Sequence, residues 1–356
     1  MEVLIRVASV GGVMNMRKVR LGIVGAGGIT NHFHLPELKQ IEEAEIVAVA
    51  DLNENRARLT AQKWAIKRWY TNYLEMLERD DIDAVIVATP HPTHAEITVS
   101  ALRADKHVMI QKPMATNTRD SWRIVEEARR RPSLKVMVLP FVYFDTPVYD
   151  YVKDILLQNN IGQVVMVEAL TSHGGPEKYQ EEVASMFGEK VDIWYFDKNR
   201  AQGGALLDLG VYSIARIVYL LGRVKSVFGY LTTLEKPTGL DDNNMVFLDM
   251  EGGALAVAAS SWTQKPGENS TSLYGTKGTI FINKINTPLM VFLDGKGWLI
   301  PQLSKEKEPQ HTHRHFIKCI INDVQPLGSP EEGHHVVQVL EAAYKSASTG
   351  TVVQIT

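Results

Sequence analysis

Residues 20–30 read RLGIVGAGGIT, a short apolar run followed at once by a glycine-rich loop. A strand buried on both faces of a parallel sheet has this apolar character. A helical pattern follows the loop, so the glycines lie between a strand and a helix N-terminus. A glycine-rich loop is a specific signature only in this structural context. The stretch therefore predicts the first unit of a doubly wound α/β domain.

Four further strand patterns follow, separated by segments of helical length and composition. They read EIVAVAD (45–51), DAVIVATP (83–90), HVMIQKP (107–113) and KVMVLP (135–140). Right-handed crossovers place the carboxyl ends of all these strands on one edge of the sheet. We predict a Rossmann-type dinucleotide-binding domain over residues 17–140, preceded by an N-terminal extension over residues 1–16.

The alternation of strand and helix patterns ends after Pro140. One helix pattern covers residues 147–158, and several strands then follow one another between residues 225 and 300, separated by glycine turn signals such as Glu251-Gly252-Gly253. Turns at such short spacing indicate hairpins. We predict a C-terminal α+β domain over residues 141–356, with a large, mainly antiparallel open sheet and a closing helix near residues 333–348.

Composition favours a globular protein with a small-molecule partner. At 356 residues the chain exceeds the size of one core, and 45% hydrophobic and 22% charged residues are ordinary globular values. A net charge of −3 favours neither nucleic acid nor an anionic membrane. Cys319 is the only cysteine, which fits a reducing compartment such as the cytoplasm.

The glycine-rich loop and the next strand predict a dinucleotide site. Gly25 permits a tight turn, and Gly27, with its neighbours Gly28 and Ile29, lets the backbone approach a pyrophosphate at the helix N-terminus. Thr30 stands at the third glycine position, so we expect slightly looser packing between helix and strand. The ordinary alternative is a plain strand–helix turn.

Asp51 lies 23 residues after Gly28, near the spacing at which a carboxylate meets the adenosine ribose hydroxyls. That carboxylate would repel a 2′-phosphate, so we expect NAD as the cofactor. Arg56 is close enough in sequence to leave NADP open. The ordinary alternative is that Asp51 caps the following helix.

Two segments carry candidate catalytic residues. Lys112 ends a strand on the cofactor edge, where an ammonium can stabilise a substrate oxygen as a hydride departs. In the probable helix GGALLDLGVYSIARIVYLLG (203–222), Asp208 and Tyr212 are four residues apart and share a face. We expect Lys112 and an oxidised nicotinamide to lower the pKa of Tyr212. Tyr212 would then exchange the substrate proton, while Asp208 orients the tyrosine. The alternatives are a solvated lysine and a buried tyrosine satisfied by a capping aspartate.

The ordered set of motifs resembles the Gfo/Idh/MocA family of sugar and polyol oxidoreductases over nearly all of residues 17–356. The set consists of the glycine-rich loop, ATPHPTHAEI, QKP, GGALLDLGVY, YGTKGTI and EAAYKSASTGTVV. The resemblance implies hydride transfer between NAD(P) and a hydroxyl or carbonyl of a sugar, polyol or cyclic diol. Lys112 matches the catalytic lysine of the family's E-K-P motif, with Gln111 in place of glutamate. Four residues match the segment bordering the nicotinamide: Thr89, Pro90, His91 and His94.

Tyr212 stands where the family often has histidine. This resembles the branch of glucose–fructose oxidoreductase, dihydrodiol dehydrogenase and some xylose dehydrogenases. His173 and Trp194 are candidates for the substrate pocket, with a structural role in the sheet as the alternative. We expect a homodimer or homotetramer formed through the C-terminal sheet, because an open sheet presents a broad face that a copy of itself can cover.

Three other interpretations compete with these. An NAD-dependent glycosidase would oxidise its substrate only transiently, and a non-catalytic dinucleotide sensor would not need Lys112, Asp208 and Tyr212 together. His311, His313, His315 and Cys319 admit a metal site, but without paired ligand spacing we expect no metal and a polar loop that enters a helix.

Overall fold

Two β-sheets organise the chain in the computed structural model, which describes residues 18–139, 146–284, 287–303 and 313–356. The first sheet has six strands in the order β3-β2-β1-β4-β5-β6, and every neighbouring pair is parallel. The chain crosses from one side of the sheet to the other between β1 and β4, which creates a crevice at their carboxyl ends. The predicted doubly wound fold is confirmed.

The first sheet alternates with short helices. Its strands are β1 (Val19–Val24), β2 (Ala44–Ala50), β3 (Arg68–Tyr70), β4 (Ala84–Val87), β5 (His107–Ile110) and β6 (Val136–Val138). The helices are α1 (Leu35–Leu38), α2 (Glu54–Trp64), α3 (Tyr73–Leu77), α4 (His94–Arg103) and α5 (Thr118–Arg130).

Successive side chains of each strand point to opposite faces, and both faces are covered. In β1, Leu21 and Ile23 pack into a core with α1 and α2. Val24, with β4 residues such as Val85, belongs to a second core formed with α4 and α5. Two buried faces explain why these strands read as uninterrupted apolar runs.

The second sheet has nine strands in the order β14-β13-β12-β11-β7-β10-β9-β8-β15. Only β10 and β7 pair in parallel, and the predicted hairpins β9–β10, β11–β12 and β13–β14 are all present. The strands are β7 (Val164–Ser172), β8 (Val224–Thr232), β9 (Asn243–Met250), β10 (Leu255–Ser261), β11 (Asn269–Gly275), β12 (Gly278–Lys284), β13 (Thr287–Leu293), β14 (Gly297–Leu299) and β15 (Val353–Gln354). The predicted mainly antiparallel sheet is confirmed.

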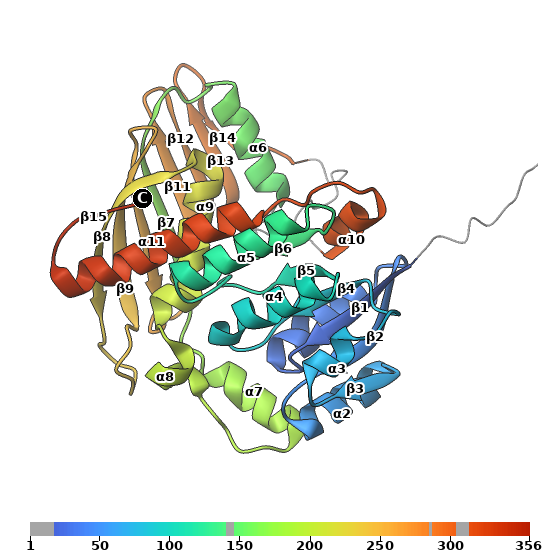
Figure 1. The fold of residues 1–356 in the computed structure, drawn as a ribbon. Coiled ribbons are helices and arrows are strands. Elements are labelled where there is room, and N and C mark those ends of the chain that lie inside the picture. Colours follow the sequence, from blue (N-terminus) through green and yellow to red (C-terminus); the bar gives the residue numbers. More distant parts are fainter. Residues whose placement is uncertain (1–17, 140–145, 285–286, 304–312) are drawn as a thin grey trace, which may run out of the picture.

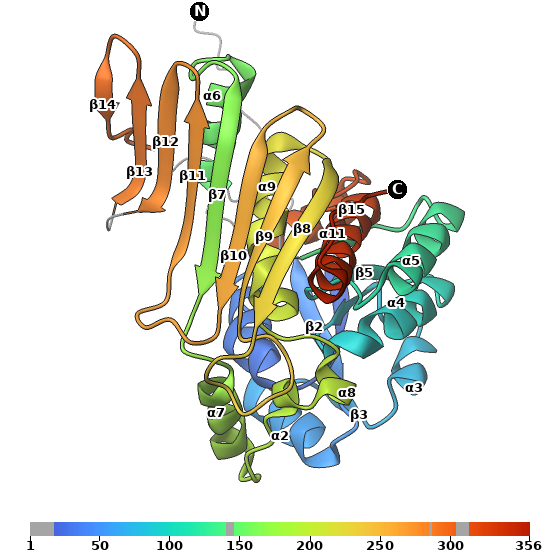
Figure 2. The ribbon, with the colours of Figure 1, turned by 90° about the vertical axis from the view of Figure 1, so that its left-hand side faces the viewer.

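Helices cover one face of this sheet and leave the other open. The helices of this part are α6 (Thr146–Leu157), α7 (Glu177–Phe187), α8 (Lys198–Ala201), α9 (Val211–Leu221), α10 (His313–Ile321) and α11 (Pro330–Thr349). Residues of α6, α9 and α11 share one core with the inward side chains of the strands. Figure 2 shows the sheet from its uncovered side, with α6 and α9 behind it.

The late helices also return to the first sheet. Phe316 and Ile317 of α10 join the core around Leu21, and Val337 of α11 joins the core on the opposite face. Figure 1 shows α11 lying beside α5 and alongside β8. The two sheets are therefore held together by elements that lie more than 150 residues apart in the sequence.

One helical stretch, Lys198–Leu221, is long and apolar enough to cross a membrane by length and composition. In the fold, 83% of its most apolar window is buried inside the protein. This burial is typical of a core helix, because a helix that is hydrophobic on all sides must be covered by other elements.

Candidate functional site

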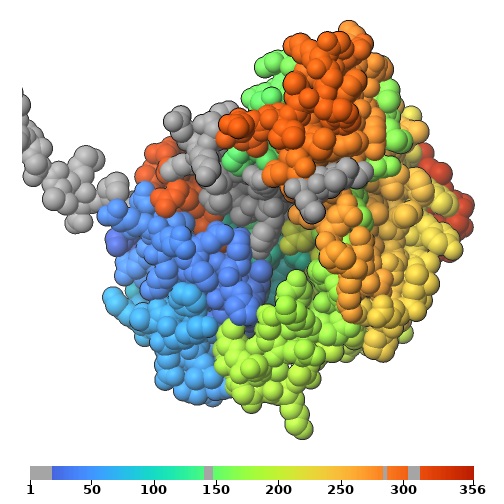
Figure 3. Space-filling view, turned by 180° about the vertical axis from the view of Figure 1, so that it is seen from behind, coloured from blue at the N-terminus to red at the C-terminus, as the bar shows by residue number. Residues whose placement is uncertain are grey.

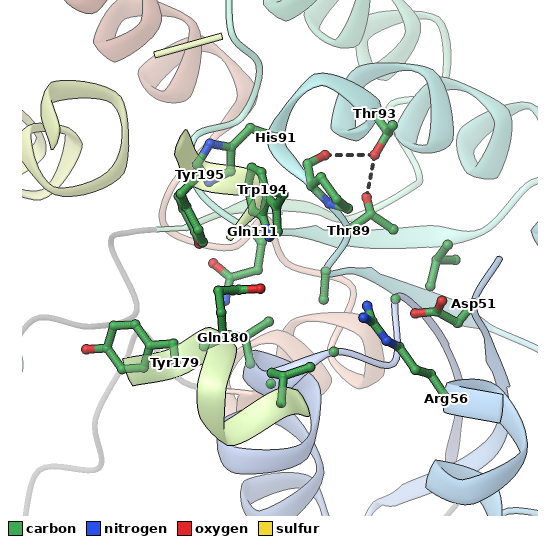
Figure 4. A pocket seen from close by; sticks show the side chains of 18 of the residues that line it. Asp51, Arg56, Thr89, His91, Thr93, Gln111, Tyr179, Gln180, Trp194 and Tyr195 are labelled. Atoms are coloured by element: carbon green, nitrogen blue, oxygen red, sulfur yellow. Dashed lines mark hydrogen bonds between the residues drawn. The ribbon is translucent and has the colours of Figure 1, made fainter. Parts of the chain in front are cut away.

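A cleft of about 1240 Å³ lies at the carboxyl ends of the parallel strands, where the second part of the chain meets the first. Figure 4 shows Asp51 and Arg56 at one end and His91, Trp194 and Tyr195 at the other. All predicted site residues except His94 line the cleft, namely Gly25, Gly27, Gly28, Ile29, Asp51, Arg56, Thr89, Pro90, His91, Gln111, Lys112, His173, Trp194, Asp208 and Tyr212.

The glycine-rich loop is shaped for close backbone approach. Gly25 has φ +101°, and a Cβ there would lie 2.3 Å from the Ala88 carbonyl oxygen, so only glycine fits. A Cβ on Gly27 would meet nothing within 4 Å, which leaves the backbone open to the cleft. The buried Thr30 donates its hydroxyl hydrogen bond to the Gly25 carbonyl over 2.6 Å. The threonine at the third glycine position therefore braces the loop.

Asp51 shapes the loop rather than the helix that follows. Its carboxylate accepts hydrogen bonds from the backbone N–H groups of Ala26 (2.8 Å) and Asn53 (2.9 Å). The alternative that Asp51 caps α2 is wrong, because the N-cap is Asn53, whose side chain accepts the Arg56 N–H. Asp51 thus ties β2 to the glycine-rich loop on the wall of the cleft.

Helix α7, from the second part of the chain, packs over this loop. A Cβ on Gly28 would lie 2.8 Å from a methyl of Val183, so glycine is required for the close contact. Asn55 donates to the Phe187 carbonyl (3.1 Å), and Glu189 accepts from the Arg56 guanidinium. In Figure 3 the green segment that contains α7 lies directly against the blue N-terminal residues.

A buried ion pair joins the two parts of the chain at the other end of the cleft. The Lys112 ammonium lies 2.6 Å from Oδ1 of Asp208 and 2.8 Å from its carbonyl oxygen. The Trp262 indole N–H donates to Oδ2 over 3.0 Å. Burial raises the pKa of Asp208, but Lys112, His173 and His91 outweigh it, and the pKa falls to about 2.

The turn that carries Asp208 is itself held by a buried carboxylate. Asp208 lies in a π-helical turn, η5 (Leu206–Gly210), immediately before α9. Asp241 accepts the N–H groups of Gly204 (3.1 Å) and Leu206 (2.7 Å) at the start of this turn. Tyr344 of α11 donates to the same carboxylate over 3.0 Å. The position of Asp208 therefore depends on the segment just before β9 and on α11.

Tyr212 lies beside the ion pair, with the Lys112 nitrogen 5.0 Å from the centre of its ring. Burial and the Asp208 charge raise the pKa of Tyr212 well above its ordinary value. The expected fall in the pKa of Tyr212 does not result from the protein's own groups, because burial and the nearby carboxylate dominate. Tyr212 is accordingly a neutral phenol at physiological pH.

His173 has a defined tautomer. Its Nδ1 accepts the Gly175 N–H over 2.9 Å, and burial lowers the pKa of His173, so the neutral ring carries its proton on Nε2. That nitrogen faces Oδ2 of Asp208 at 3.9 Å. His173 is thus a hydrogen-bond donor in the cleft, not an acceptor of protons.

Aromatic rings form a wall of the cleft near the ion pair, since Tyr195 packs edge-on against Trp262, the donor to Asp208. Trp194 and Tyr195 stack at 3.9 Å, and His91 meets both edge-on at 5.2 and 5.7 Å. Burial, followed by the charge of Lys112, lowers the pKa of His91 well below its ordinary value. Nδ1 of His91 has no hydrogen-bond partner among the described residues.

His94 does not reach the cleft, so its predicted cofactor contact is wrong. The side chain is fully buried, and its ring nitrogens lie 2.7 Å from the carbonyl oxygens of Thr89 and Pro113. Because the ring bridges the loops that follow β4 and β5, His94 holds the segments that carry Thr89 and Lys112. Its role in the structure is to position these segments.

The histidines near residue 313 are arranged differently from the expected polar loop. His313 begins α10 and is buried, with its ring nitrogens 2.7 Å from Nδ1 of His34 and 2.6 Å from a carboxylate oxygen of Glu37. His315 lies inside α10 next to Cys319, and His311 lies outside the described residues. Within the described ranges, no three His, Cys, Asp or Glu side chains are grouped as metal ligands.

Several lining residues had no signal in the sequence. They are chiefly His32, Tyr179, Gln180, Val183, Asp192, Tyr195 and Arg200. Most belong to the segment 177–200, which carries none of the motifs described in the sequence. A sequence pattern cannot show which loop folds back over a distant strand edge.

The chain belongs to the Gfo/Idh/MocA family of NAD-binding oxidoreductases. Residues 19–139 match the oxidoreductase family with an NAD-binding Rossmann fold, and residues 149–281 match the GFO/IDH/MocA C-terminal domain. The sequence is 30% identical to dTDP-3,4-didehydro-2,6-dideoxy-alpha-D-glucose 3-reductase of Saccharopolyspora spinosa, over 83% of this chain and 85% of that protein. It is 26% identical to myo-inositol 2-dehydrogenase of Thermotoga maritima, over 92% and 96% of the two chains.

Solved structures share the whole fold. Levoglucosan dehydrogenase in complex with NADH has a TM-score of 0.80 at 20% identity, covering 96% of this chain and all of that one. Aldose-aldose oxidoreductase from Caulobacter crescentus has a TM-score of 0.81 at 22% identity, with 95% and 100% coverage. The matched family is described as NAD-binding, and the open backbone at Gly27 with Asp51 beside it fits this dinucleotide.

The low pKa of Asp208 implies that the free energy of unfolding depends on pH. A carboxyl with a folded-state pKa of about 2 and an ordinary value of 3.8 stabilises the fold above pH 4 and loses that contribution as pH falls toward 2. We expect Asp208→Asn to be less stable than wild type at pH 7 by about 2 kcal/mol. The difference should stay constant down to pH 4 and then narrow, as measured by urea unfolding at each pH.

Asp192→Asn is the matched control for this measurement. Asp192 pairs with Arg200 at 2.8 Å, but both side chains are about half exposed, so the same change should have a small effect. A difference that already narrows between pH 7 and pH 5 would show that Asp208 titrates near neutrality and carries a proton there.

Proposed function

We propose that this protein is a dehydrogenase that transfers a hydride between NAD and a secondary hydroxyl of a small sugar, polyol or cyclic diol. The observation that carries the proposal is the buried Lys112–Asp208 pair in the same cleft as the dinucleotide loop. Relatives named for a deoxysugar, an inositol and a dihydrodiol support this substrate class. We assign dinucleotide binding to residues 17–140 and substrate binding to residues 141–356.

Lys112 is proposed to bind the reacting oxygen of the substrate. The ammonium is 12% exposed and faces the cleft, so it offers a positive charge where the oxygen gains electron density as hydride leaves. Asp208 holds Lys112 through two contacts, and Trp262 and His173 orient the carboxylate in turn. When bound, the nicotinamide supplies the hydride acceptor or donor.

Tyr212 is proposed to exchange the substrate proton. Asp208 stays ionised with Oδ1 bonded to Lys112 and Oδ2 to Trp262, and His173 presents a donor rather than a lone pair. The neutral phenol is the form that donates a proton to a carbonyl oxygen during reduction. For oxidation the phenol must lose its proton, so the oxidative rate should increase toward alkaline pH.

The aromatic wall supports a ring-shaped substrate. Trp194 and Tyr195 stack on one another and line the cleft, while Tyr179 and Gln180 of α7 add polar groups nearby. Apolar rings of this kind can cover the flat face of a ring-shaped substrate, and the polar groups can orient its hydroxyls. The cofactor-contacting set proposed here comprises Gly25, Gly27, Gly28, Ile29, Asp51, Thr89, Pro90, His91 and Gln111.

Two substitutions test the catalytic assignment once sugars, inositols and cyclic diols have been screened with NAD. Lys112→Ala should lower turnover strongly while NADH affinity changes little, because the ammonium acts on charge that develops during the reaction. Tyr212→Phe should lower turnover by roughly 10²- to 10⁴-fold and remove the alkaline rise in the oxidative rate. Steady-state kinetics over a pH series and NADH fluorescence titration measure both effects.

Near-wild-type turnover in Tyr212→Phe would assign proton transfer to another group. Tyr219→Phe is the matched control, because Tyr219 lies on the same helix and bonds Asp150 outside the cleft. Turnover without net accumulation of NADH would favour the glycosidase interpretation, in which oxidation is transient. NAD binding without turnover of any screened compound would favour a sensor.

The open face of the second sheet supports a homodimer or homotetramer. Large apolar side chains stand out from adjacent strands of this face, and together they form an open-face patch of Met166, Tyr230, Met245, Phe247 and Leu255. Met245 pairs across the strands with Tyr230, and Leu255 with Met166. Phe247, which follows Met245 on the same face, pairs with Val257, which follows Leu255 on that face, so the patch is continuous. Apolar surface of this extent is normally buried against a partner.

We expect light scattering to give a mass at least twice 39.8 kDa at micromolar concentration. Phe247→Glu should shift the protein to monomers, since an isologous interface would bury the introduced charge in both copies. Leu157→Glu is the control, because Leu157 is 82% exposed at the end of α6, outside the patch. A wild-type mass of 39.8 kDa would contradict the proposal.

The cellular compartment is proposed from chemistry alone. One buried cysteine, Cys319, gives the chain no opportunity for an internal disulfide, which suits the reducing cytoplasm where NAD-linked metabolism takes place.

A further inference from the structure

The adenosine end of the cleft contains an ion pair that bears on the choice of cofactor. Arg56, on the first turns of α2, is the basic residue closest in sequence to the ribose-binding Asp51. Figure 4 shows its guanidinium pointing into the pocket beside the Asp51 carboxylate. An arginine in this place is the group that accommodates a ribose 2′-phosphate in NADP-dependent proteins.

We propose that Glu189 is a specificity-determining residue that excludes NADP by holding Arg56 in an ion pair. This inference rests on the proposed NAD-dependent function and adds a second determinant to Asp51. Glu189 is not among the residues that line the cleft, so it acts through Arg56 and is a positioning residue. It belongs to the second part of the chain, two residues after α7 ends.

Glu189 accepts several short hydrogen bonds from Arg56 and Asn53. Oε2 of Glu189 accepts from Nη2 of Arg56 at 2.6 Å and from Nε at 2.9 Å. Oε1 accepts from the Asn53 side-chain amide at 3.0 Å. Both oxygens of Glu189 are therefore bonded to residues that immediately follow Asp51, and charge-assisted bonds of this length are among the stronger ones.

Burial makes the pair hard to open. The side chains of Arg56 and Glu189 are 27% and 16% exposed, so water cannot replace the lost partner fully. A 2′-phosphate that recruited Arg56 would leave the Glu189 carboxylate without its cation and beside a new anion. Removing one member of a largely buried pair is costly for this reason.

The other cation at this end of the cleft is also engaged. Arg200 bonds both oxygens of Asp192 at 2.8 Å. The described residues that line this end thus combine the Asp51 carboxylate with two arginines already paired to acidic groups. The charges at the adenosine end of the cleft therefore favour the neutral ribose hydroxyls of NAD over a phosphate dianion.

The test is direct titration of the full-length protein with NADH and with NADPH, followed by cofactor fluorescence. Glu189→Gln keeps the shape and removes the charge. We expect wild type to prefer NADH, and Glu189→Gln to bind NADPH at least about tenfold more tightly while its NADH affinity changes little. The NADH titration on the same sample reports whether the variant is folded.

A second substitution identifies Arg56 as the mediator. In the Glu189→Gln background, Arg56→Ala should abolish the gain in NADPH affinity, because the freed guanidinium is what binds the phosphate. A double-mutant cycle gives the coupling between the two residues. Glu182→Gln is the charge-matched control: Glu182 lines the same cleft from α7 and faces His32 and Lys178, so its change should alter NADPH affinity far less.

The outcomes separate this inference from the proposed function. A wild type that binds NADPH more tightly than NADH contradicts the interpretation of Asp51 and, with it, this inference. A wild type that prefers NADH, with unchanged NADPH affinity in Glu189→Gln, overturns the role of Glu189 alone. An equal gain in Glu182→Gln, or a gain that survives Arg56→Ala, also overturns it, because the effect would then be general charge removal.

Discussion

The Lys112–Asp208 ion pair is the contact on which the arrangement of the cleft depends. Lys112 comes from the end of the parallel sheet and Asp208 from the turn before α9, 96 positions later in the sequence. Removing two charges from water costs several kcal/mol per ion, so such a pair persists only where further hydrogen bonds satisfy it. Trp262 and the Asp208 carbonyl supply them, and Asp241 and Tyr344 hold the turn in place.

The sequence was sufficient for the parts of this structure that are governed by local pattern. Apolar runs with no polar alternation predicted a parallel sheet covered on both faces, and the cores around Leu21 and Val85 account for them. Closely spaced glycine turns predicted the hairpins of the second sheet. The cleft residues followed because strand ends share one edge, a rule of topology that needs no side-chain detail.

What the sequence did not reveal depends on contacts between distant segments. Helix α7 carries none of the motifs that pointed to the cleft, yet its Val183 covers Gly28 and the following Glu189 binds Arg56. The pKa of Tyr212 was expected to fall because Lys112 is near. Burial and the Asp208 charge reverse its direction, and neither can be judged before the packing is known.

The chain of hydrogen bonds behind Lys112 accounts for glutamine at position 111. The Lys112 N–H donates to Oε1 of Gln111, so the amide nitrogen faces Nε2 of His34 at 3.2 Å and donates to it. Burial lowers the pKa of His34, and its single proton therefore sits on Nδ1, pointing at Nε2 of His313.

His313 in turn donates from Nδ1 to Glu37, so each proton in the chain has one place. A carboxylate at position 111 would need a proton from Nε2 of His34. The hydrogen bond between His34 and His313 would then reverse its direction, with Nε2 of His313 donating to Nδ1 of His34. An unprotonated Nδ1 of His313 would face the Glu37 carboxylate unless a histidine became charged. Because burial lowers the pKa of His34, that ring stays neutral, and the neutral amide at position 111 matches a His34 that accepts at Nε2 and donates from Nδ1.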